Sequence, residues 1–181
     1  MSKNQSVTEK SKKRHIAQFF GNLSWKGTGI IIFILLIVGV YLFLRMNPPI
    51  EVHTIVSNEE NTSIVVGIGN TGFISMNLVD VTVNKKEEPS EVALQVSTFE
   101  DGFIVMEDRE NAEAEGLEFI DIDERPITIG TVLAEPSESE GAGLEEVEIY
   151  GVSIFHEKKV HSVQIKYRHF GMTYEETIQI K

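Results

Sequence analysis

Carboxylates are the side chains in this sequence that come closest to forming a chemical site. They crowd residues 107–118, recur as Asp121, Asp123 and Glu124, and return between residues 135 and 146. Calcium takes about six to eight oxygen ligands, which acidic loops can supply. Asp121, Asp123 and Glu124 are therefore candidate calcium ligands. The D-x-D-x-D-G spacing of an EF-hand loop is missing, and solvated, self-repelling loops explain the same residues, so we favour no metal.

Histidines offer a second kind of metal site. Those that could supply zinc ligands are His53, His156, His161 and His169. His161 and His169 have the same parity as Val163, so both should point to one face of a single strand. They would lie about 26 Å apart at about 3.3 Å per residue, too far to share one metal ion. We expect solvated or strand-end histidines and no zinc.

The sequence gives little support for nucleophilic catalysis or for nucleotide binding. The chain has no cysteine and no G-x-S-x-G motif, and Ser137 and Ser139 have no basic residue near them in the sequence. Gly67, Gly69 and Gly72 spell G-x-G-x-x-G, but β-branched residues surround them and a strand follows, whereas dinucleotide binding needs a helix. The sequence therefore predicts a protein that is not an enzyme, with no catalytic residue and no cofactor.

Charge is divided unevenly along the chain. The net charge is −12, with 16 basic and 28 acidic residues. Residues 1–26 carry six basic residues against Glu9 alone, a net +5, whereas residues 46–181 carry about −18. An acidic region of that size repels nucleic acid, so we exclude nucleic acid as a partner.

A membrane-spanning helix is predicted between the two charged regions. Residues 27–44 are uncharged and mostly apolar. As a helix they cover roughly 27 Å, close to the hydrocarbon thickness of about 30 Å. Trp25 and Tyr41 suit the two interfaces. The run is too long for a signal peptide and lacks an A-x-A cleavage pattern, which predicts an uncleaved signal anchor at residues 27–45.

The positive-inside rule orients this helix. It predicts a basic cytoplasmic tail at residues 1–26 and an extracytoplasmic domain at residues 46–181, in a single-pass protein of the plasma membrane. The absence of cysteine favours a bacterial surface. Within the tail, Ile16, Phe19, Phe20 and Leu23 have the spacing of an apolar helical stripe that could lie in the inner headgroup layer. A disordered tail that only sets the topology is the alternative, and both stay open.

The sequence after Pro49 predicts a series of β-strands. Ile64, Val66 and Ile68 alternate up to a turn signal at Asn70–Gly72. The apolar parity then changes near Val79, which predicts a β-bulge or a strand that crosses between sheets. We expect no helix of about 11 residues or more in this region.

Further strands complete the predicted domain. Residues 92–96 alternate up to Glu100-Asp101-Gly102, which predicts a three-residue hairpin loop leading into a strand at 103–106. Runs at 147–155, 160–169 and 174–180 predict a C-terminal meander of three strands, with Val163, Ile165 and Tyr167 facing inward. Eight or nine short strands predict an all-β fold, an antiparallel β-sandwich.

One part of this region is similar to a known family. The segment Gly69-Asn70-Thr71-Gly72, followed by Leu78-Val79-Asp80-Val81-Thr82-Val83, resembles the opening of CARDB-like and related immunoglobulin-like bacterial surface modules. The resemblance covers about 25 residues. It implies an immunoglobulin-like sandwich at a cell surface and carries no catalytic residue with it.

These observations favour a non-enzymatic, membrane-anchored interaction or accessory module of the cell envelope. Its expected partners are the lipid bilayer and another envelope protein. Two alternatives are a sensor or signalling subunit that binds an external ligand and a calcium-stabilised adhesion-type module. An envelope enzyme is the remaining class, and a pocket with convergent, pKa-shifted side chains would favour it.

Overall fold

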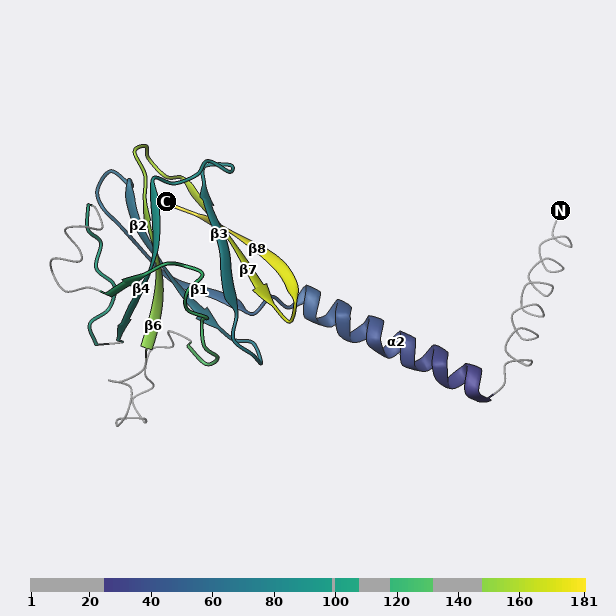
Figure 1. Cartoon of the computed structure of the whole chain (residues 1–181). Coiled ribbons are helices and arrows are strands. Elements are labelled where there is room, and N and C mark those ends of the chain that lie inside the picture. The colour runs from purple at the N-terminus through teal and green to yellow at the C-terminus, as the bar shows by residue number, and fades with distance from the viewer. Residues whose placement is uncertain (1–24, 99, 108–117, 132–147) are drawn as a thin grey trace, which may run out of the picture. The chain divides into compact units, whose positions relative to one another are not determined.

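The computed structural model describes residues 25–98, 100–107, 118–131 and 148–181 (Figure 1). The chain divides into two compact units between Asn47 and Pro48. The predicted amphipathic stripe of the tail and most of the acidic stretches lie outside the described residues.

The helix α2 spans Trp25–Met46 and is long and apolar enough to cross a membrane. Its apolar side chains are exposed on every face, from Ile30 to Phe43. The Phe43 carbonyl accepts from both the side-chain amide and the backbone N–H of Asn47, at 2.7 and 3.2 Å, in the last turn of the helix. The two prolines that follow cannot continue the helix. The helix ends one residue after the predicted boundary at residue 45.

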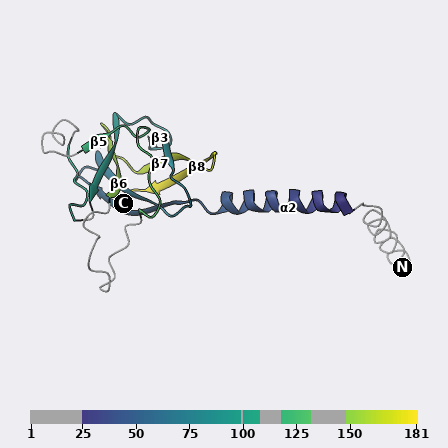
Figure 2. The ribbon, with the colours of Figure 1, turned by 60° about the horizontal axis from the view of Figure 1, so that its bottom comes forward.

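Eight described strands form two antiparallel sheets. The five-stranded sheet has the order β1-β2-β6-β4-β5, and the three-stranded sheet has the order β3-β7-β8 (Figures 1 and 2). The strands are β1 Ile50–Ser57, β2 Ser63–Asn70, β3 Asn77–Val83, β4 Glu91–Thr98, β5 Glu118–Ile120, β6 Glu148–Phe155, β7 Ser162–His169 and β8 Met172–Gln179. No described residue after Met46 is helical. The predicted all-β, antiparallel sandwich is confirmed at this level.

The core lies between the two sheets. From the smaller sheet, Val163, Ile165 and Tyr167 of β7 are completely buried, while the residues between them face outward. This confirms the predicted register. The bulge is also confirmed: the pairing of β3 with β7 shifts between Leu78 and Asp80, so Val79 is the extra residue.

The predicted C-terminal meander is wrong. Only β7 and β8 pair with each other, through a turn at Phe170 and Gly171 in which both φ values are positive. The preceding strand β6 pairs with β2 and β4 in the other sheet. Both faces of β6 are buried, which is typical of a central strand, whereas a strand with one open face alternates as β7 does.

The predicted hairpin after Gly102 is also wrong. Gly102 has the expected positive φ of 66°, but residues 103–106 form no strand. Strand β4 already pairs with β6 along its whole length and with β5 at residues 94–96, so the ladder positions in its middle are taken on both sides. The segment instead lies over the outer face of the sheet, where the Phe103 ring is so near Gly151 that a Cβ there would sit 2.8 Å from it.

Candidate functional site

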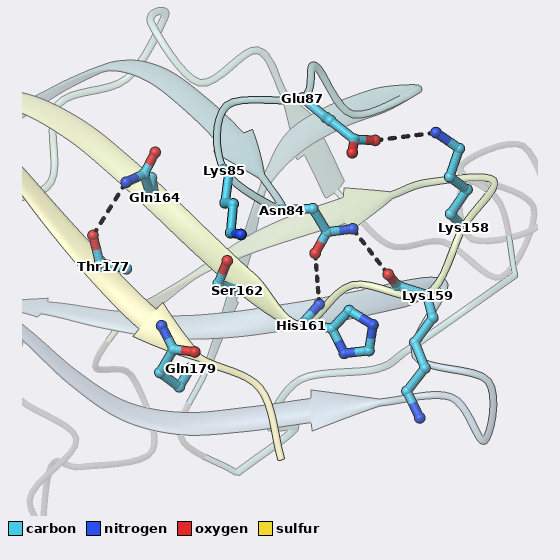
Figure 3. A pocket seen from close by; sticks show the side chains of 10 residues that line it. All are labelled: Asn84, Lys85, Glu87, Lys158, Lys159, His161, Ser162, Gln164, Thr177 and Gln179. Atoms are coloured by element: carbon cyan, nitrogen blue, oxygen red, sulfur yellow. Dashed lines mark hydrogen bonds and ion pairs between the residues drawn. The ribbon is translucent and has the colours of Figure 1, made fainter.

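A depression of about 680 Å³ lies where β3 and β8 end and β7 begins. We call it the basic depression, because its lining includes the basic residues Lys85, Lys158, Lys159 and His161, with Glu87 as the one carboxylate. Figure 3 shows these side chains and the polar ones beside them. A concentration of lysine is unusual in a domain whose net charge is strongly negative.

The turn that follows β3 forms one wall of the basic depression. Asn84, Lys85 and Lys86 have φ values of 44°, 68° and 81°, a run in the left-handed region that non-glycine residues rarely adopt. Backbone strain of this kind persists only where the surroundings hold it, and it is often found at functional sites.

The side chain of Asn84 holds this turn in place. Its amide nitrogen donates to the Lys159 carbonyl at 2.9 Å, and its oxygen accepts from the His161 backbone N–H at 2.8 Å (Figure 3). Hydrogen bonds between the backbones of Val83 and Glu87 close the turn. The β3–β4 turn and the β6–β7 turn are thus joined as one unit.

Charge in the basic depression is only partly balanced. A Glu87 oxygen lies 3.2 Å from Lys158 Nζ and 3.6 Å from His156 Nε2. The hydrogen bond from Lys158 is the main cause that lowers the pKa of Glu87. Among the described residues, no carboxylate lies within ion-pair distance of Lys85 or Lys159, and Lys85 points toward Ser162 in Figure 3. The depression can therefore attract an anionic group.

A second polar cluster lies at the other end of the sandwich. The buried Tyr150 hydroxyl donates to Glu148 at 2.9 Å, and Arg125 contacts both oxygens of Glu148 at 2.7 and 3.0 Å. Burial is the main cause that raises the pKa of Tyr150. Each group has a partner, so the cluster satisfies the tyrosine hydroxyl at the edge of the core, and no group is set up to act as a base.

The candidate calcium ligands do not converge. Asp121, Asp123 and Glu124 are exposed in the turn after β5, where the Glu124 N–H donates to the Asp121 carbonyl. Within the described ranges, no three His, Cys, Asp or Glu side chains are grouped to hold a metal ion. The carboxylates at 108–117 and 135–146, and both Ser137 and Ser139, lie outside the described residues.

The positions of His161 and His169, and of the glycines of the G-x-G-x-x-G sequence, follow from the bounds of the strands. His169 ends β7, and His161 precedes its first residue, so the two lie at opposite ends as predicted. His169 is buried, however, and neither ring nitrogen has a hydrogen-bond partner among the described residues, which its strand-end position did not indicate. Gly67 and Gly69 lie within β2, and the next regular element after Gly72 is the strand β3.

The basic depression was missed by sequence reasoning. Its lysines come from turns about 75 residues apart, and no local spacing connects them. The one available signal was the asparagine between β3 and two lysines, because asparagine tolerates positive φ.

Comparison of the chain with protein-family models, with curated proteins and with solved structures finds no match.

Proposed function

We propose that this protein is a single-pass, non-enzymatic module of the bacterial cell envelope, anchored in the plasma membrane with its N-terminus in the cytoplasm. The observation that carries the proposal is α2, which exposes apolar side chains on all faces and ends directly before a sandwich. Such a helix is stable in hydrocarbon and not in water. The +5 charge before it and the −18 charge after it favour this orientation.

Protease added to intact protoplasts tests the anchoring. The domain after Pro49 should be digested while the tail stays protected, and breaking the membrane should expose the tail. Protection of the C-terminal domain in intact protoplasts would contradict the orientation.

We further propose that the sandwich is immunoglobulin-like. The strand order supports this: β1-β2-β6-β4 facing β3-β7-β8 corresponds to the A-B-E-D and C-F-G sheets of the constant-type immunoglobulin fold, with β5 added at one edge. The CARDB-like resemblance of β2 and β3 points the same way. Domains of this architecture commonly bind through the loops at the ends of their sheets.

The basic depression is the surface that we assign to binding, and an acidic segment of another envelope protein is the partner that fits it. Three features support this: Lys85 and Lys159, which have no carboxylate partner in the part of the chain that the structure describes, the strained turn, and a position at the far end of β7 from Pro49. Strand β7 covers seven steps of about 3.3 Å, so the depression lies roughly 23 Å along the sheet from the anchored end.

A photo-crosslinker at a single introduced cysteine tests this assignment, since the natural chain has none. Lys85→Cys should give a crosslinked protein in intact cells, while Lys166→Cys, exposed at the middle of the same sheet, should give little. Lys159→Glu should reduce the adduct formed at position 85. Equal adducts at both positions, or no adduct at either, would contradict the assignment.

A further inference from the structure

Four large apolar side chains are exposed at one end of the sandwich. They are Phe73, Ile74, Ile129 and Phe170, with exposed fractions of 72, 42, 54 and 49%. We call them the apolar tip. They come from three separate connections: β2 to β3, the segment after β5, and the turn between β7 and β8. A cluster of exposed apolar side chains on a protein surface commonly marks a site of contact with a membrane or with another protein.

Contacts place these three connections around Pro49. The Pro49 carbonyl accepts hydrogen bonds from the N–H and the hydroxyl of Thr71, at 2.8 and 3.0 Å. A Cβ on Gly72 would sit 2.6 Å from His169 Nε2 and 2.8 Å from the Pro49 Cβ, so the β7–β8 turn adjoins the same point. Figure 1 shows that turn and the start of β1 at one end of the sandwich.

The segment after β5 reaches the same end. The Gly130 N–H donates to the Asn70 carbonyl at 3.0 Å, and the Asn70 side chain donates to Ile127 and Ile74 carbonyls. Asn70 is completely buried, so it fixes the two loops against each other. These hydrogen bonds and close contacts thus hold the apolar tip in place at the end of the sandwich where the chain enters the domain.

The connection to α2 limits how far this end can lie from a membrane. The helix ends at Met46 and β1 begins at Ile50. Four steps of at most about 3.6 Å allow roughly 14 Å between them, and the two prolines stiffen the path. The headgroup layer on each side of the hydrocarbon is about 5–8 Å thick. The apolar tip is therefore held beside that layer whenever α2 spans the bilayer.

We infer that the apolar tip inserts into the headgroup layer of the outer leaflet and seats the sandwich on the membrane. This rests on the proposed anchoring, because it needs α2 to cross the bilayer. Phenylalanine and isoleucine gain free energy on leaving water for this layer, and aromatic side chains favour it. The occupant is lipid, since the short connection brings lipid to the tip without a binding step.

Charge indicates that the contact is apolar and not electrostatic. Residues 46–181 carry a net charge of about −18 in the sequence. Anionic headgroups would be repelled by a domain of this charge. The contact should therefore form on phosphatidylcholine and gain nothing from anionic lipid.

Single-cysteine labelling of the full chain in phosphatidylcholine vesicles tests the inference. An environment-sensitive fluorophore is placed at Phe170→Cys, at Lys158→Cys on the far end of the sandwich, and at Leu36→Cys in α2. Nitroxide groups are carried by the lipid, either in the headgroup region or deep in the acyl chains. We expect the label at 170 to be quenched by shallow nitroxide several-fold more than the label at 158, and the label at 36 to be quenched by deep nitroxide.

The outcomes separate the two proposals. An unquenched label at Leu36 would overturn the anchoring itself. Quenching at Leu36 together with equal, weak quenching at positions 170 and 158 would leave the anchoring intact and overturn the seating of the apolar tip. Quenching at 170 that disappears when the protein is diluted in lipid would show a contact between two copies of the chain, and would also overturn it.

A matched pair of substitutions tests the role of the apolar side chains. With the label at Ile129→Cys, the exchange Ile74→Ser should reduce quenching, because it removes an apolar group of the same tip. Ile55→Ser removes the same type of side chain with the same exposure, 42%, from the edge strand β1 and should leave quenching unchanged. Equal effects of the two changes would contradict the inference.

Discussion

Truncation of Ile165 tests the packing of the sandwich more directly than any other change. Ile165 is completely buried in the middle of β7, where it lies opposite Val81 of β3. Lys166, the next residue, is exposed and lies opposite Asp80 and Glu175. Neighbouring residues on a strand point to opposite faces, so the two substitutions to alanine probe the core and the solvent face of the same strand.

The expected magnitudes differ strongly. Ile165→Ala removes three buried carbons, worth about 0.8 kcal/mol each, and leaves a cavity that the two sheets cannot close. We expect a loss of about 2 to 5 kcal/mol in the free energy of unfolding. For a unit of about 130 residues, a loss of about 3 kcal/mol lowers the melting temperature by roughly 10 °C. Lys166→Ala should cost within about 0.5 kcal/mol, the range typical of surface sites.

Urea unfolding of the full chain in detergent, followed by the circular dichroism of the strands, measures both losses. The slope against urea should be the same in both variants, because the surface exposed on unfolding hardly changes. A shift of one residue in the register of β7 would reverse the two costs. Equal losses, or a larger loss for Lys166→Ala, would therefore refute the register.

Three further changes test individual contacts. Burial is the main cause that lowers the pKa of His169, and the nearby Ile74 backbone offsets it only in part. The histidine takes up a proton near pH 6.5 in the unfolded chain but only at lower pH in the folded one, so the free energy of unfolding should fall as the pH drops below about 6.5. Urea melts at a series of pH values measure this fall, and His169→Leu should make it smaller. Gln95→Met should leave stability unchanged or raise it by about 1 kcal/mol in the same melts, because the buried amide has no hydrogen-bond partner within the described ranges; a clear loss would contradict this. Gly151→Ala should cost about 1 to 3 kcal/mol, because its Cβ would sit 2.7 Å from a Val65 methyl carbon and 2.8 Å from the Phe103 ring; an unchanged melting temperature would show that the ring moves aside freely.

The sequence alone predicted the features that depend on neighbours in the chain. The end of α2 follows from the two prolines after Asn47, and the register of β7 follows from its strict alternation. The bulge at Val79 was visible as a change of parity. In each case the physical cause, a blocked helix ladder or one buried face, acts within a few residues.

Only the tertiary structure decided which strands pair and which loops meet. Strand β6 is apolar on both faces, so its sequence was compatible with either sheet, and its place between β2 and β4 was set by the packing of the whole sandwich. Lys85 and Lys159 are brought together by Asn84, and the connections that carry Phe73 and Phe170 by the close approach of Gly72 to His169 and Pro49. Local periodicity reports which face of a strand is buried, but it carries no information on a neighbour that lies tens of residues away in the chain.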